Sequence, residues 1–215
     1  MTVFALVRHG ETDWNRERRI QGSTDIPLNE LGRQQARATG ALLATRRWTA
    51  LVASPLSRAA ETARLIGEHV GLGDPELEPR LAERDYGAAE GLTGFEIDAL
   101  FPDGADVPGR EARESVAERA VAALHDLAAR HPGEAVIVVA HGGVIRSVLE
   151  AVDPGRHREQ ITNGSVHSFR HADGALALVA FDDPIDEQSI FEFADDFEQQ
   201  NPLVARERRR ESDAP

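Results

Sequence analysis

The feature of this sequence that most constrains its fold is a run of six apolar residues, 135–140 (AVIVVA). Gly133 precedes the run, and a His-Gly-Gly turn at residues 141–143 follows it. A half-exposed strand would alternate apolar and polar side chains, and this run does not. It therefore predicts a central strand buried on both faces, as in parallel sheets that are covered by helices on each side.

Strand and helix patterns alternate along the rest of the chain. Short apolar stretches predict strands, and apolar residues at helical spacing predict helices. The turn residues Asp173 and Gly174 lie between two apolar stretches, which predicts a terminal hairpin in the sheet. The expected strands are residues 2–7, 50–53, 135–140, 166–170 and 175–181, and the expected helices are residues 29–46, 56–70, 114–130 and 144–152. The pattern predicts an α/β core.

The expected helix at residues 29–46 has a recognisable start. Asn29 is a candidate N-cap, because its side chain can accept a hydrogen bond from a free main-chain N–H of the first turn. Leu31, Leu42 and Leu43 are expected to point towards the core. Gly71 is expected to cap the carboxyl end of the next helix.

One domain and a tail are expected from the length and the charge distribution. The chain has 215 residues, which suits a single well-filled core, and the domain is expected to span residues 1–181. Residues 92–113 form a small cap segment in this prediction, with a short helix near 95–101 packed onto the domain. Residues 182–215 are strongly charged and are expected to form a solvated, partly disordered tail.

Composition excludes several classes of function. All 24 basic residues are arginine and no cysteine is present, so a Schiff-base lysine, a P-loop lysine and thiolate chemistry are impossible. The formal net charge of −13 argues against nucleic acid and anionic membranes as partners, because both are held largely by basic surfaces. No apolar window approaches a membrane span, and the first apolar run is too short for a signal peptide, so a cytoplasmic location is expected.

Three of the predicted strands end next to basic side chains. Arg8 and His9 directly follow the first strand, Arg58 lies just beyond the second, and His141 directly follows the run at 135–140. Ligands of open α/β sheets bind beyond the carboxyl ends of the strands, so these groups are expected to converge. Guanidinium and imidazole groups suit a phosphoryl group, and the N–H groups of Gly142 and Gly143 at a helix start could add donors. A phosphate monoester, on a small phosphorylated metabolite, is the expected substrate.

Five sequence motifs resemble those of the histidine phosphatase superfamily, also called phosphoglycerate mutase-like proteins. The first is RHGETDWN, which contains Arg8, His9 and Asn15. The others are QGSTDIPLNELGRQQA (21–36), SPLSRAAET (54–62), LAERDYGAAEGLT (81–93) and VAHGGVIR (139–146), and the resemblance covers residues 1–181. It implies a three-layer α/β/α sandwich with a mainly parallel central sheet.

The resemblance also implies roles for individual residues. His9 would carry a phosphohistidine intermediate, and Glu83 would protonate the leaving oxygen and later deprotonate the attacking water. The phosphoryl oxygens would be held without a metal or another cofactor by Arg8, Asn15, Arg58 and His141. General chemistry agrees, because a neutral imidazole is a competent nucleophile and a second group must supply the proton.

Several alternatives remain open for single residues. Asp85 and Glu90 compete with Glu83 as the acid, and Arg58 could simply pair with Glu61 at i+3 on a helix. Gln21, Ser23 and Thr24 are candidate substrate contacts or ordinary turn residues. A zinc site is disfavoured, because no His-Glu-x-x-His motif and no cysteine occur. The six other histidines, such as His69 and His131, are expected on the surface.

Three functions from different classes fit the resemblance. Cofactor-dependent mutases carry a longer, more basic insertion after the acid-bearing motif and an asparagine after the second His-Gly pair, whereas this chain has a short acidic segment at 92–113 and Gly143. An acidic cap would repel the second phosphate of a bisphosphorylated intermediate. A phosphatase is therefore preferred to a mutase, and a non-catalytic binding protein on the same fold is the third possibility. The leaving group and the oligomeric state are not determined by the sequence.

Overall fold

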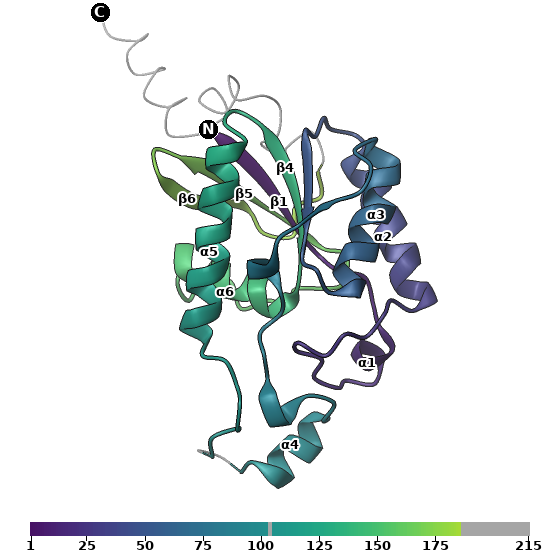
Figure 1. Cartoon of the computed structure of the whole chain (residues 1–215), viewed down its shortest axis with the longest axis vertical. Helices are drawn as coiled ribbons and strands as arrows, with labels where there is room; N and C mark the ends of the chain where they lie inside the picture. The colour runs from purple at the N-terminus through teal and green to yellow at the C-terminus, as the bar shows by residue number, and fades with distance from the viewer. Residues whose placement is uncertain (103–104, 186–215) are drawn as a thin grey trace, which may run out of the picture.

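A six-stranded sheet in the order β3-β2-β4-β1-β5-β6 forms the centre of the protein (Figure 1). The computed structural model describes residues 1–102 and 105–185. The predicted run forms β4, which lies between β2 and β1. The strands are β1 (Thr2–Arg8), β2 (Ala50–Ala53), β3 (Glu76–Leu77), β4 (Ala135–Ala140), β5 (Val166–Ala172) and β6 (Ala175–Ala180).

The sheet is mainly parallel, as expected. β4 pairs in parallel with both β1 and β2, and β2 pairs in parallel with β3. β5 pairs antiparallel with β1 and with β6. The β5–β6 turn is the predicted pair Asp173 and Gly174, and both have positive φ angles, 52° and 76°, as tight hairpin turns require. The predicted hairpin is therefore confirmed.

Helices cover both faces of the sheet (Figure 1). On one face α2 (Glu30–Leu43) and α3 (Ser57–Val70) pack together, and on the other face lie α5 (Arg113–Arg130) and α6 (Gly142–Val152). The alternation of side chains along β1 builds two separate cores. Phe4 and Leu6 belong to the core under α5 and α6, whereas Ala5 and Val7 belong to the core under α2 and α3. The three-layer α/β/α sandwich is confirmed.

Both cap signals of α2 and α3 are confirmed, but α2 ends at Leu43, three residues before the end expected from the sequence. Asn29 caps α2 by accepting a hydrogen bond from Gly32 N, and Gly71 ends α3 in the left-handed conformation with φ 74°. Leu43 is fully buried, but Leu31 is 48% exposed, so the prediction for Leu31 was wrong. Leu31 lies in the first turn of α2, on the side away from the buried positions Gly32 and Ala36.

Packing continues beyond Phe181, where the domain was expected to close. Asp183 accepts a hydrogen bond from the Ser168 hydroxyl, and Ile185 is buried in the core under α2 and α3. His167 on β5 is also fully buried, so the expectation that it lies on the surface was wrong. The rest of the expected tail, residues 186–215, lies outside the described residues.

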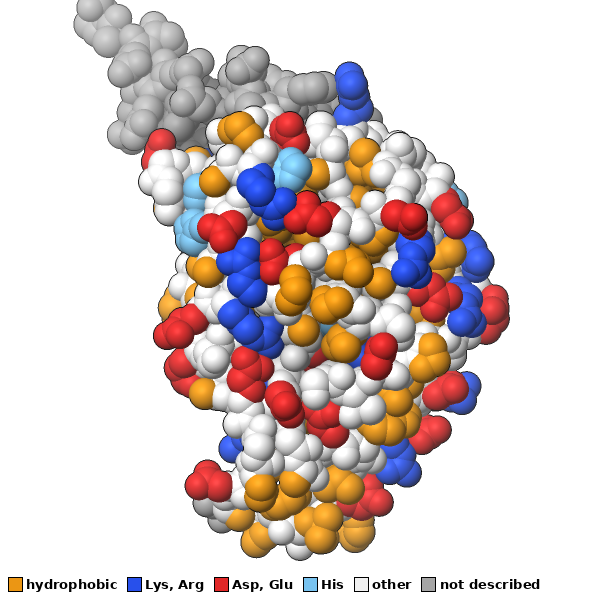
Figure 2. All heavy atoms as spheres, in the orientation of Figure 1, with side chains coloured by type: hydrophobic (Ala, Val, Ile, Leu, Met, Phe, Trp, Pro, Cys, Tyr) orange, Lys and Arg blue, Asp and Glu red, His pale blue; other side chains and the backbone are white. Residues whose placement is uncertain are grey.

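The cap segment projects from the carboxyl edge of the sheet (Figure 1). Its helix α4 (Gly94–Leu100) starts with a capping box between Thr93 and Glu96. Phe95 is 84% exposed, so the expectation that this helix packs its aromatic residues onto the domain was wrong for Phe95. Figure 2 shows hydrophobic side chains gathered over α4. No helix in the described part of the chain is both long and apolar enough to cross a membrane.

Candidate active site

A cavity of about 490 Å³ opens at the edge of the sheet where β1, β2, β3 and β4 have their carboxyl ends. The parallel strands bring residues that are far apart in the sequence to this one edge, as the sequence predicted. Seven of the predicted site residues line the cavity: Arg8, His9, Asn15, Gln21, Arg58, Glu83 and Gly142. His141 lies directly behind, and its ring centroid is 5.1 Å from that of His9.

His9 follows β1 directly and is almost completely buried. Its Nδ1 lies 2.7 Å from the main-chain oxygen of Gly10, and a carbonyl can only accept, so Nδ1 carries the proton. Nε2 therefore keeps its lone pair. Burial, reinforced by the positive charges of Arg8 and Arg58, holds the pKa of His9 well below the usual value for histidine. The ring is neutral at pH 7 and can act as a nucleophile.

The backbone after His9 is held by two contacts that leave no room for side chains. Gly10 N donates a hydrogen bond of 3.0 Å to the Thr62 hydroxyl on α3. A Cβ on Gly10 would lie 2.2 Å from the carbonyl oxygen of Gly32 on α2. The carbonyl that orients His9 is thus fixed against both helices of one layer.

Arg8 and Arg58 point unpartnered N–H groups into the buried part of the site. Arg8 donates one hydrogen bond of 2.6 Å to Ile161 O, and Arg58 donates to Gly22 O and Thr24 O at 2.7 and 2.9 Å. The Nε atoms of both arginines are buried without a partner in the described part of the chain. Buried cationic donors of this kind suit the oxygens of an anion.

The alternative role of Arg58 as the partner of Glu61 is not realised. Arg58 is fully buried, and Glu61 instead accepts a hydrogen bond of 2.7 Å from Arg33 Nε on α2. Arg58 is therefore held by main-chain carbonyls alone, and its charge faces no carboxylate within hydrogen-bond distance among the described residues.

His141 follows β4 and is the N-cap residue of α6. Its Nε2 lies 2.7 Å from the hydroxyl oxygen of Ser54, and its Nδ1 is buried without a partner in the part of the chain described. Burial, with the charge of Arg58 next in importance, holds the pKa of His141 well below the usual value. Both histidines of the site are neutral at pH 7.

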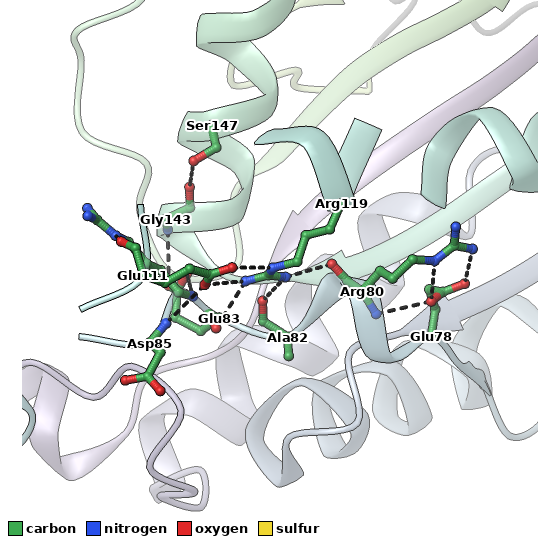
Figure 3. A network of polar contacts seen from close by, with 10 residues as sticks. Glu78, Arg80, Ala82, Glu83, Asp85, Glu111, Arg119, Gly143 and Ser147 are labelled. Atoms are coloured by element: carbon green, nitrogen blue, oxygen red, sulfur yellow. Dashed lines mark hydrogen bonds and ion pairs between the residues drawn. The ribbon is translucent and has the colours of Figure 1, made fainter. Parts of the chain in front are cut away.

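Glu83 lines the cavity and belongs to the segment that follows β3. Its carboxylate accepts hydrogen bonds from Gly143 N at the start of α6, at 3.0 Å, and from Arg84 N, at 2.8 Å. Arg119 on α5 holds the main chain of the same segment by donating to the carbonyl oxygens of Arg80 and Ala82 at 2.7 and 2.6 Å (Figure 3). Two main-chain donors and this clamp fix where the carboxylate points.

The two rival carboxylates are engaged elsewhere and do not line the cavity. Asp85 accepts a hydrogen bond of 2.7 Å from Gly87 N. Glu90 accepts main-chain bonds from Ser23 and Thr24 at 2.7 and 2.9 Å. Of the three candidates for the acid, only Glu83 lies at the cavity.

Four weaker candidates fall into two pairs. Asn15 closes the capping box of α1 (Asp13–Arg16), and Gln21 is buried at the cavity with an Oε1 that has no hydrogen-bond partner among the described residues. Ser23 and Thr24 do not line the cavity, and their hydroxyl groups donate to Glu90. Of the two alternatives, the role as turn residues fits the geometry of Ser23 and Thr24, because Glu90 accepts the protons of both hydroxyl groups.

Several cavity residues were missed by the sequence analysis. Gly22 and Arg146 lie inside the quoted motifs, so their neighbours in sequence could have indicated them. Residues 158–161 lie in the irregular segment between α6 and β5, which has no periodicity and gave no signal. Arg146 supports this segment by donating to the carbonyl oxygens of His157 and Glu159. Across residues 1–102 and 105–185, no three His, Asp or Glu side chains cluster closely enough to hold a metal ion.

Comparison with known proteins decides the family. A model of the histidine phosphatase superfamily (branch 1) matches residues 4–184. The chain belongs to this superfamily. The uncharacterized phosphatase PhoE of Bacillus subtilis (strain 168) is 38% identical over 176 residues, which cover 80% of this chain and 90% of the relative. A 2,3-bisphosphoglycerate-dependent phosphoglycerate mutase 2 of Gloeobacter violaceus is 35% identical over 199 residues, which cover 83% and 90%.

Solved structures of histidine phosphatases have the same fold. The mycobacterial glucosyl-3-phosphoglycerate phosphatase in complex with VO3 matches with a TM-score of 0.75 and 32% identity, covering 84% of this chain and 98% of that one. The phosphoglycerate mutase-like fold expected from the motifs is thereby confirmed. Several similar proteins of this superfamily are named phosphatases, so the chain is an enzyme of the phosphatase class.

Proposed function

We propose that this enzyme hydrolyses phosphate monoesters of small metabolites through a phosphohistidine on His9, without a metal or another cofactor. The observation that carries the proposal is the state of His9, whose Nε2 lone pair is left free by the bond from Nδ1 to Gly10. The same site contains the Nε groups of Arg8 and Arg58, which have no partner within residues 1–102 and 105–185. The cavity volume of about 490 Å³ suits a small molecule.

In the first step, His9 Nε2 attacks phosphorus and the bond from phosphorus to the ester oxygen breaks. The carboxyl group of Glu83 gives its proton to the departing oxygen, and the product alcohol leaves. Phosphate monoesters are among the slowest molecules to hydrolyse unaided, so charge on the transferred oxygens must be strongly stabilised. Arg8, Arg58 and His141 supply that stabilisation, with Asn15 and the main chain at Gly142 as further donors.

In the second step, water attacks the phosphorus of phospho-His9 and the bond from phosphorus to nitrogen breaks. The carboxylate of Glu83 takes the proton of the water, and inorganic phosphate is released. Glu83 ends the cycle protonated and His9 ends it neutral, so the enzyme is ready for the next substrate. One carboxyl group thus serves as acid and then as base.

Trapping the intermediate tests the proposal. Enzyme quenched during turnover should contain phosphate that is stable to alkali, labile to acid and attached to His9. His9→Asn should form none, whereas replacement of the exposed His69 by Asn should leave the amount unchanged. Turnover should persist in EDTA. Phosphate trapped on another residue, or activity that EDTA abolishes and a metal restores, would refute the mechanism.

A phosphoglycerate mutase is the second candidate, because relatives include proteins of that name. With 3-phosphoglycerate and catalytic 2,3-bisphosphoglycerate, we expect release of phosphate to exceed isomerisation. An isomerisation rate well above phosphate release would make the mutase the better description.

A further inference from the structure

Ser54 does not line the cavity, but its hydroxyl group lies within hydrogen-bond distance of His141. It follows β2 as His141 follows β4, and Ser54 N donates a hydrogen bond of 2.9 Å to Val139 O on β4. The neighbouring strands therefore fix the distance between the two residues. The hydroxyl oxygen of Ser54 lies 2.7 Å from His141 Nε2, and both side chains are fully buried.

The direction of this hydrogen bond follows from the partners of the hydroxyl group. A serine hydroxyl has one proton to donate and lone pairs to accept. The oxygen already lies 3.3 Å from the donor Leu56 N, so a main-chain N–H occupies one accepting site. Among the described residues His141 Nε2 is the one acceptor for the proton. If Nε2 donated instead, the Ser54 proton would be buried without an acceptor, which is costly in a protein interior.

We propose that Ser54 is a positioning residue that donates to His141 Nε2 and thereby keeps the proton of His141 on Nδ1. Nδ1 is the ring nitrogen that has no partner in the described part of the chain. With its proton there, a neutral His141 presents a hydrogen-bond donor. The opposite tautomer would leave a lone pair on Nδ1, which repels the oxygens of an anion.

His9 and His141 then differ in the role of the ring nitrogen that is left without a protein partner, and one neighbour sets that role in each ring. Gly10 O accepts from His9 Nδ1 and leaves a lone pair on Nε2, whereas Ser54 donates to His141 Nε2 and leaves a proton on Nδ1. One ring is prepared to attack and the other to donate, although both are neutral. The benefit to phosphoryl transfer rests on the proposed function, but the tautomer assignment does not.

Nitrogen NMR of the uniformly labelled protein tests the assignment directly, because protonated and unprotonated imidazole nitrogens have well-separated shifts. The His141 signals are identified by their loss in His141→Gln. We expect Nδ1 of His141 to be protonated and Nε2 to be unprotonated at pH 7. A protonated Nε2 in the unmodified protein would overturn the proposal, whatever the activity of any variant.

Replacement of Ser54 by alanine adds the functional readout. We expect the His141 proton to redistribute towards Nε2 and formation of phospho-His9 to slow by about 10- to 100-fold, since a donor to the transferred group is partly lost. Inhibition by inorganic phosphate should weaken in parallel. Ser57→Ala is the matched control, because the Ser57 hydroxyl lies in the same turn but bonds to Asp25 at 2.8 Å and does not line the cavity.

These measurements distinguish the proposed role of Ser54 from the proposed phosphatase mechanism. A Ser54→Ala variant with the original tautomer and a rate within twofold of the unmodified enzyme would overturn the role of Ser54. If Ser54→Ala does not fold, the spectrum of the unmodified protein still decides the assignment. If the tautomer is as proposed but no phosphate is trapped on His9, the proposed function fails and the assignment stands.

Discussion

At the scale of single residues, Glu83 can occupy its place only because residue 143 lacks a side chain. A Cβ on Gly143 would lie 2.5 Å from Glu83 Oε1, closer than any real contact of that kind. The same residue donates its main-chain N–H to the other carboxylate oxygen. Gly143 thus leaves room for the Glu83 carboxylate and also donates one of the hydrogen bonds that hold it in place.

Gly143→Ala should therefore displace Glu83 and slow the first step by about 10- to 100-fold for alkyl phosphates, within the range expected for general-acid help. p-Nitrophenyl phosphate should be affected much less, because its leaving group needs little protonation. Single-turnover formation of phospho-His9 measures the step. Gly94→Ala is the control, since a Cβ there meets nothing within 4 Å. Equal slowing of both substrates would mean that Glu83 is not the acid.

Arg158 offers a prediction about the leaving group. Of the arginines that line the cavity, it alone has no hydrogen bond or ion pair to the described residues. A substrate with a carboxylate on its leaving group could pair with it at the cavity mouth. We expect Arg158→Gln to raise KM severalfold for phosphorylated acids and to leave neutral sugar phosphates unchanged. Arg156→Gln, in the same segment but outside the cavity, should change neither; a uniform change for both substrate classes would contradict the prediction.

At the scale of elements, Arg119 joins α5 to the segment that carries Glu83 (Figure 3). Its guanidinium also forms an ion pair of 2.8 Å with Glu111. Arg119→Met should lower the free energy of unfolding by about 2 kcal/mol, because charge-assisted hydrogen bonds to several carbonyls are lost. It should also slow alkyl phosphates more than aryl phosphates, because Glu83 loses its support.

Arg130→Met is the control for Arg119, since Arg130 lies on the same helix and forms an exposed pair with Glu76, remote from the cavity. Urea unfolding and single-turnover rates measure the two effects. If Arg119→Met is destabilised but keeps the substrate dependence of the unmodified enzyme, the clamp contributes to stability alone.

Elements with a strong pattern were predictable, and short ones were not. β4 and α3 were found because their apolar spacing reflects burial on two faces and on one face, respectively. β3 has two residues, both exposed, so no hydrophobic pattern marks it. The convergence of Arg8, His9 and Arg58 was expected because each follows a predicted strand, and the motifs placed Glu83 with them. The contacts of Arg119 with the segment that carries Glu83 are tertiary contacts that no local pattern encodes.

At the scale of the whole molecule, buried neutral histidines link stability to pH. Burial lowers the pKa of His9 and His141 well below the usual value, and it lowers that of His167 to about 4. In the unfolded chain each ring takes up a proton near pH 6.5. Below that pH the unfolded state binds more protons than the folded state, so stability falls as pH falls, by up to roughly 1.4 kcal/mol per pH unit for each histidine.

Urea unfolding between pH 7.5 and 5 measures this dependence. Full stability is expected above about pH 6.5, with a decline below it that starts before aspartate and glutamate are protonated. His167→Gln should reduce the slope of the free energy of unfolding against pH by the amount that corresponds to about one bound proton. Replacement of the exposed His69 by Gln should leave this slope unchanged. A slope unchanged in His167→Gln would show that His167 is not the group responsible.

The parallel sheet also separates the start of β1 from the cavity. Each strand from β1 to β4 starts at one edge and finishes at the cavity edge, so Thr2 lies roughly 20 Å from Arg8, the length of β1. A linker fused ahead of residue 1 would leave from the side away from the cavity. Enzyme attached to a surface through that linker should present its cavity to the solution and keep its activity in the immobilised state.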